Sequence, residues 1–155
     1  MDYPFERIIE SLEPSLERLL AMEPVRIGSI PRDFPVSGVY LLSEGPKHLY
    51  VGRSRNIRRR LAHHSRPGAT HRMAALAFRI AREETGCVRP AYRETRSRKD
   101  LMRDPQFAAA FQAAKARIRA MDVRAVQEPN PAKQAVLEVY VAVELRTPYN
   151  DWDTH

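Results

Sequence analysis

The sequence predicts an α+β protein, in which a small β-sheet is combined with several amphipathic helices. Residues 36–42 and 47–51 are short runs of β-forming residues, and the segment SEGP at 43–46 between them is a turn pattern. Together they favour an antiparallel hairpin. A third alternating run, DVRAVQE at 122–128, comes much later in the chain. Other apolar residues recur at spacings of three and four, which is typical of helices.

The N-terminal segment predicts a helix over residues 3–21, with Glu and Arg between its apolar positions. We expect Pro14 to divide it into two short helices, because proline removes a backbone donor and restricts the residue before it. The helix is interpreted as a cover for one side of the core, with dimerisation as the alternative. Residues 22–37 are a proline-rich connector, with an extended piece expected at 25–30.

The rest of the chain is predicted to be mainly helical. Asn56 or Ser54 can cap the helix that follows the hairpin, and Thr70 can cap the next one. Pro105 predicts a break within residues 97–121, and Pro131 suits the first position of the last helix. The expected helices are 57–65, 71–84, 97–121 and 131–145, with a further strand, weakened by Pro90, at 88–95.

The charge distribution favours a polyanionic partner. The formal net charge is +7, and the sequence pI is about 10.0. No Asp or Glu occurs from Gly45 to Arg82, a segment that holds many arginines, whereas the first 24 residues are acidic. A segregated basic surface is expected of a protein that binds the phosphate backbone of DNA. Arginine predominates over lysine, and its planar fork suits bidentate phosphate contacts.

Other classes of protein are disfavoured by the sequence. Cys87 is the only cysteine, so neither an intrachain disulfide nor a thiolate metal cluster can form. No apolar run reaches the roughly 18 residues needed to span a bilayer, and the N-terminus lacks the features of a secretory signal. The spacing of His63, His64 and His71 matches no strong zinc pattern. We therefore expect a cytoplasmic protein that does not enter membranes.

Several polar residues stand out as candidates for chemistry. Glu138 is the one charged residue between Ala135 and Val143. A buried carboxylate requires a cation or a metal as partner, although the alternative is a Glu that faces solvent. Arg60 and His64 lie four residues apart and share a helix face, as Arg59 and His63 do; a basic surface helix is the alternative for both pairs. Tyr40 and Tyr50 lie on the two hairpin strands, where nearby cations would help a phenol to ionise.

These residues form an ordered pattern. Its parts are Gly38-Val39-Tyr40, Tyr50-Val51-Gly52, Ser54 with Asn56, Arg60, His64, Glu138 and Pro148-Tyr149-Asn150. In this order they resemble the GIY-YIG nuclease superfamily, with Val in place of Ile in both tripeptides. The resemblance covers residues 36–65 and 122–150. It implies a small three-stranded, mostly antiparallel sheet flanked by helices, and hydrolysis of phosphodiester bonds in DNA by an endonuclease that uses one divalent ion.

The resemblance also implies roles for individual residues. Glu138 would bind the metal ion, Mg²⁺ or Mn²⁺. Tyr40 or Tyr50 would serve as, or position, the base that activates water. Arg60 would stabilise charge on the scissile phosphate, and His64 would assist. Supporting roles are expected for Gly52, Asn56 and Asn150, and contacts to DNA for Arg53, Arg55, Arg59, Arg66 and Arg72.

The expected organisation is a single domain with two additions. Residues 1–35 form an N-terminal helical extension, and residues 66–121 form a mainly helical insertion in the core. The insertion is interpreted as shaping the substrate channel or buttressing the fold. The alternative function is a nucleic-acid-binding module of the same fold that has lost catalysis. The preferred DNA structure, the biological role and the formation of a homodimer stay open.

Overall fold

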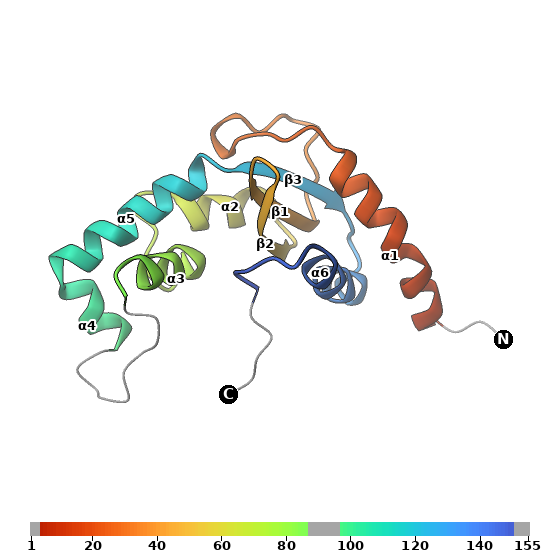
Figure 1. Cartoon of the computed structure of the whole chain (residues 1–155). Coiled ribbons are helices and arrows are strands. Elements are labelled where there is room, and N and C mark those ends of the chain that lie inside the picture. Colours follow the sequence, from red (N-terminus) through yellow and green to blue (C-terminus); the bar gives the residue numbers. More distant parts are fainter. Residues whose placement is uncertain (1–3, 87–96, 151–155) are drawn as a thin grey trace. The chain divides into compact units, whose positions relative to one another are not determined.

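A computed structural model describes residues 4–86 and 97–150 of the chain (Figure 1). The chain divides into two compact units, the first made of residues 1–60 and 121–155 and the second of residues 61–120. The second unit is almost the predicted insertion, but it begins five residues earlier than expected. The expected strand at 88–95 lies outside the described residues.

The predicted α+β fold is confirmed. The first unit contains a three-stranded sheet of β1 (Gly38–Glu44), β2 (Lys47–Ser54) and β3 (Asp122–Gln127). The strand order is β2-β1-β3, and β1 is antiparallel to both neighbours. A tight turn at Gly45, whose φ is 59°, joins β1 to β2 and confirms the hairpin. β2 extends three residues beyond the predicted end at Val51, and β1 begins and ends two residues later than the predicted strand at 36–42.

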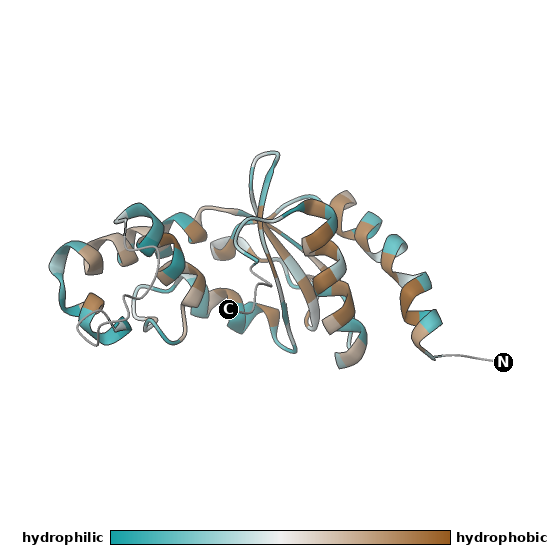
Figure 2. Ribbon diagram, turned by 60° about the horizontal axis from the view of Figure 1, so that its bottom comes forward, coloured by the Kyte–Doolittle hydropathy of each residue, from teal (hydrophilic) through white to brown (hydrophobic). Residues whose placement is uncertain are grey.

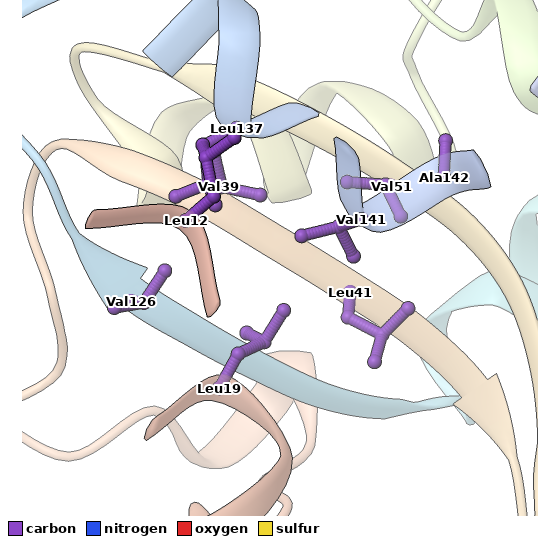
Figure 3. Packing of buried hydrophobic residues seen from close by; sticks show 9 residues of the cluster. All are labelled: Leu12, Leu19, Val39, Leu41, Val51, Val126, Leu137, Val141 and Ala142. Carbon is purple, nitrogen blue, oxygen red and sulfur yellow. The ribbon is translucent and has the colours of Figure 1, made fainter. Parts of the chain in front are cut away.

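Two helices cover one face of this sheet. They are α1 (Pro4–Ala21) and α6 (Pro131–Leu145), and α6 begins at Pro131 as predicted, with the Asn130 side chain accepting hydrogen bonds from two backbone N–H groups. Val39 and Leu41 of β1 are fully buried beneath them. Figure 3 shows the side chains that meet there. They are Leu12, Leu19, Val39, Leu41, Val51, Val126, Leu137, Val141 and Ala142.

The division of the N-terminal helix at Pro14 is wrong. The helix α1 runs without interruption from Pro4 to Ala21. Pro14 is exposed, so its ring lies on the solvent side of the helix. The carbonyl group four residues earlier, which proline cannot bond because it has no N–H group, lies on the same side. Hydrophilic and hydrophobic residues alternate along α1 (Figure 2), which indicates that burial of its apolar side maintains the helix.

The connector contains little extended structure. In place of the expected extended piece, Val25 forms a single bridge to Val123 of β3, and a short 3-10 helix, η1, follows at Ile27–Ser29. Further along, the helix α2 (Ile57–Ser65) has the predicted bounds. The Asn56 side chain accepts a hydrogen bond from the Arg59 N–H group, which caps the start of α2.

The second unit is helical, as the sequence predicted for the insertion. It contains α3 (Ala75–Glu84), α4 (Arg98–Arg103) and α5 (Pro105–Arg119). The break at Pro105 is confirmed, because Asp104 caps α5 and Pro105 opens it. The helix expected from residue 71 begins at Ala75 instead, because the Thr70 carbonyl and hydroxyl groups hold a turn over the preceding residues.

A buried lysine stabilises the loop before α3. Lys115 is only 1% exposed, and its ammonium group donates to the backbone carbonyls of Pro67 and Ala69, at 2.7 and 2.8 Å. It also lies 4.5 Å from the centre of the Phe111 ring. Burial lowers the pKa of Lys115.

Of the helices that the structure describes, none is long and apolar enough to span a membrane.

Two glycines of the hairpin are required by close packing. A Cβ atom on Gly38 would lie 2.0 Å from the Val126 carbonyl oxygen of β3. A Cβ atom on Gly52 would lie 2.2 Å from the Tyr40 hydroxyl, because Gly52 is the cross-strand partner of Tyr40. Real side chains do not make such contacts, so the Tyr40 ring occupies the space that any other residue at position 52 would need.

We predict that Gly52→Ala destabilises the protein by about 3 kcal/mol or more, because the fully buried Tyr40 ring has no room to move. Gly68→Ala is the control, since no atom lies within 4 Å of a Cβ built there. The control should change stability by less than about 0.5 kcal/mol. Chemical denaturation measures both, and equal stability of the two variants would contradict the packing argument.

Candidate active site

The first unit contains a predominantly polar pocket with a volume of about 410 Å³. It brings together four of the five predicted catalytic residues, although Glu138 is 78 positions after Arg60 in the chain. The lining residues are Tyr40, Tyr50, Arg53, Ser54, Arg55, Arg60, Pro131, Gln134 and Glu138. Three arginines and one glutamate give the pocket an excess of positive charge.

The edge position of β2 explains how these residues meet. Arg53 pairs with Val39 across the hairpin, on the face that α6 covers. Tyr40 lies on the opposite face because successive strand residues alternate between faces. Tyr50 is two residues from Gly52, the partner of Tyr40, and therefore shares its face. Since β2 is an edge strand, residues from both faces can line one pocket.

Glu138 pairs with a cation, as expected for a carboxylate on an otherwise apolar helix segment. Its Oε1 atom lies 3.5 Å from Nε of Arg53, and the two side chains are 19% and 45% exposed. Burial raises the pKa of Glu138, while the Arg53 guanidinium opposes this rise. Glu138 therefore does not simply face solvent, and the alternative interpretation of this residue is wrong.

Tyr40 is fully buried, and the centre of its ring lies 6.4 Å from that of Tyr50. The Arg60 side chain donates a hydrogen bond to the Tyr40 hydroxyl. Burial nevertheless raises the pKa of Tyr40 well above its usual value, and the charges of Tyr50 and Glu138 add to the rise; Arg60 lowers it only in part. The cations beside Tyr40 therefore do not offset its burial, because desolvation is the larger effect. Its role as a base stays a prediction.

Asn150 supports the site through the backbone of β2. Its Oδ1 atom accepts from the Val51 N–H group and its Nδ2 atom donates to the Val51 carbonyl, both at 2.8 Å. The Thr147 hydroxyl also donates to Oδ1 at 2.7 Å. A side-chain amide thus takes the place of a neighbouring strand. The Asn150 side chain thereby holds Val51, which lies between Tyr50 and Gly52.

Gln134 lines the pocket but was not singled out from the sequence. It lies one helical turn before Glu138 and is 2% exposed. Its Nε2 atom donates to the Ser37 hydroxyl at 2.9 Å and to the Glu128 carbonyl at 2.6 Å. Since a carbonyl only accepts, these contacts orient the amide. Its Oε1 atom bonds to no other residue that the structure describes, which leaves it for a ligand. The sequence signal that could have identified Gln134 is its position four residues before Glu138, which places both side chains on one face of the helix.

The other predicted residues have different positions. Arg55 lines the pocket. Arg59 is exposed on α2, and Arg66 and Arg72 are exposed in the second unit. His64 is fully buried in the second unit and is not among the residues described as lining the pocket. Its assisting role, and the DNA contacts of the arginines, stay predictions.

The residues present fit a hard divalent cation that is bound weakly. Among the described residues, no three His, Cys, Asp or Glu side chains gather at one place. Glu138 is the one carboxylate that lines the pocket, and the Gln134 amide oxygen is a neutral donor beside it. Oxygen donors of this kind suit Mg²⁺, which usually retains several waters and takes few protein ligands.

Comparisons with known proteins give no match: no protein-family model, no curated protein and no solved structure matches the chain.

We predict that Asn150→Ala destabilises the protein by about 1–3 kcal/mol, because it leaves the Val51 N–H and carbonyl groups without their partner. The Val51 amide should also exchange its hydrogen faster. Thr147→Val is the control, since it removes the bond to Asn150 and keeps both bonds to Val51; its cost should be about 1 kcal/mol. Unchanged exchange at Val51 in Asn150→Ala would show that this side chain does not hold β2.

Proposed function

We propose that this protein is a metal-dependent endonuclease that hydrolyses phosphodiester bonds in DNA through a single site of the GIY-YIG type. The observation that carries the proposal is the position of Glu138. This late carboxylate lines the same pocket as Tyr40, Tyr50 and Arg60. These are residues to which the sequence resemblance assigned catalytic roles, and an unrelated basic surface would not require their convergence.

The arginines of the pocket suit a phosphate group. Hydrolysis of a phosphodiester needs in-line positioning and cancellation of developing negative charge. Arg60 is held by its bond to Tyr40, and a guanidinium carries five N–H donors, so this bond does not exhaust it. Arg53 and Arg55 can bind the phosphate from the β2 side of the pocket.

The buried phenol of Tyr40 is better suited to positioning than to ionisation. A phenol is neutral near pH 7 at its ordinary pKa, and burial raises the pKa of Tyr40 further. Its O–H group can therefore act as a hydrogen-bond donor in the pocket. It also fixes the guanidinium of Arg60. Tyr40 would therefore orient the attacking water or the phosphate. Tyr50 lines the same pocket and is the second candidate for the base.

The carboxylate of Glu138 would hold the divalent ion, and the amide oxygen of Gln134 is a second, neutral oxygen donor in the same pocket. When bound, such an ion polarises a water or a phosphate oxygen. Glu138 must exchange its partner Arg53 for the ion. Arg53 then becomes available to the phosphate, so one side chain neutralises the carboxylate in the absence of substrate and binds the anion in its presence.

The same ion pair favours the alternative function. A carboxylate that Arg53 already neutralises is also what a nucleic-acid-binding module without catalysis would contain. Binding of DNA without cleavage under any metal condition would support that alternative. One site cuts one strand, so cleavage of both strands would require two binding events or a homodimer. We also propose a cytoplasmic location, as expected from the sequence.

We predict that Glu138→Ala abolishes metal-dependent nicking of supercoiled plasmid in Mg²⁺ or Mn²⁺. Tyr40→Phe, which keeps the ring against Gly52, should reduce nicking by about a hundredfold or more, because a positioned donor is lost. Glu23→Ala removes an exposed glutamate of the connector and serves as the control with unchanged activity. Circular dichroism verifies that each variant is folded.

These variants separate the two functions. Undiminished nicking by folded Glu138→Ala would refute the site. Absence of nicking by the unmodified protein, together with retained DNA binding, would replace the nuclease by the binding module.

We predict that Arg53→Ala increases the affinity of the free protein for Mn²⁺ by about 1.4- to fivefold, because a partly exposed ion pair contributes about 0.2–1 kcal/mol. Electron paramagnetic resonance of unbound Mn²⁺ measures this without DNA. Arg55→Ala is the matched control, since it removes a pocket arginine that is not paired with Glu138. Equal effects of the two variants would show that the affinity changes because the pocket loses a positive charge, and not because the ion pair with Glu138 is lost.

A further inference from the structure

A second concave surface lies between α1 and α6, and it differs in chemistry from the proposed active site. It has a volume of about 480 Å³, and nearly all of its lining is apolar. The lining residues, here called the apolar groove, are Leu12, Ala135, Val136, Val139 and Tyr140. None of them lines the active-site pocket, although both surfaces use α6. The two surfaces therefore use different sides of this helix.

Exposed apolar side chains extend the groove along both helices. The described residues include six large hydrophobic side chains that are exposed, and five of these lie on α1 or α6. Phe5 and Ile9, seven and three positions before Leu12, lie on the same side of α1 by the helical period. Val143 continues the line of Val136 and Val139 on α6. Phe5 is 59% exposed and Val143 58%. Exposed apolar side chains aligned in this way on two helices beside an apolar groove mark an interaction site.

The groove has an acidic border. Glu13 and Glu17 of α1 and Glu144 of α6 are exposed. Burial raises the pKa of Tyr140, which lines the groove, and the charges of these glutamates add to the rise. The helix α1 carries four glutamates and two arginines. The whole chain, in contrast, has a net charge of +7. The basic remainder of the surface attracts anionic partners, whereas an acidic border repels them and favours a cationic partner.

We propose that the apolar groove binds an amphipathic helix of a partner protein, and that basic residues flank the apolar face of this helix. A cleft between two helices accepts apolar anchors at helical spacing, as in other helix-in-groove complexes. The basic flanks meet the glutamates of the border. The proposal does not depend on the proposed nuclease activity.

Charge argues against other occupants. A symmetric contact with a second copy would use the same patch on both copies, so the acidic borders of both, with Glu13, Glu17 and Glu144, would lie in one interface. Like charges that face each other weaken an interface. Nucleic acid and anionic membrane surfaces are repelled for the same reason. A basic amphipathic helix satisfies both the apolar lining and the border.

The test uses a fluorescein-labelled peptide of leucine and lysine, about 18 residues long, with leucines along one side of the helix. Fluorescence anisotropy with the full chain should show binding that weakens as salt increases. A second peptide with glutamate in place of lysine should not compete. Because the protein is basic overall, non-specific charge attraction would favour the glutamate peptide instead.

Matched valine variants locate the binding surface. Val139→Glu places a charge in the groove and should weaken binding of the lysine peptide by roughly tenfold or more. Val36→Glu makes the same change at a valine of the connector that is 60% exposed, and it should leave binding unchanged. Both positions are exposed, so both variants should fold, and thermal denaturation verifies this.

Three results would overturn the proposal. The first is binding of the lysine peptide that Val139→Glu does not weaken, and the second is equal weakening by Val36→Glu. The third comes from light scattering: a dimer that Val139→Glu converts to a monomer would assign the groove to a second copy. Plasmid nicking is not a readout, so failure here leaves the proposed nuclease function untouched, and the reverse also holds.

Discussion

The contact between the Tyr40 ring and the backbone of Gly52 is the constraint on which the rest of the site depends. It requires that the residue opposite Tyr40 has no side chain, and so it holds the pairing of β1 with β2 in one arrangement. A shift of one residue would move Arg53 to the other face of the sheet. Glu138 would then lose its partner, and the pocket would lose the arginine that pairs with its carboxylate.

Desolvation controls the electrostatics of the pocket more than proximity does. Tyr40 bonds to a guanidinium, yet burial raises its pKa, and Glu138 beside Arg53 shows the same balance to a smaller degree. A neutral phenol and a paired carboxylate carry little unbalanced charge at the buried end of the pocket. The positive charge of the pocket lies instead on its arginines, which can meet an anionic substrate.

The sequence predicted the elements with strong local signals and missed features that depend on tertiary contacts. Pro131 and Asn130 define the start of α6, and Pro105 ends α4, because proline and a capping side chain act within a few residues. The predicted division of the helix at Pro14 was wrong because the exposure of this residue could not be known from the sequence. The position of Glu138 in the pocket followed from the ordered pattern, whereas Gln134 acquires its orientation from Ser37 and Glu128, which no spacing rule connects to it.

The side-chain amide of Asn150 has a consequence for association. An edge strand normally presents unpaired backbone groups to which another chain can add a strand. On β2 these groups are occupied at Val51 by Asn150, and at Leu49 by the Tyr149 N–H group. On the other side of the sheet, Val25 bonds to Val123 of β3. At these points the sheet is closed to growth by strand addition, so a partner that recognises the unit there meets side chains instead of open backbone.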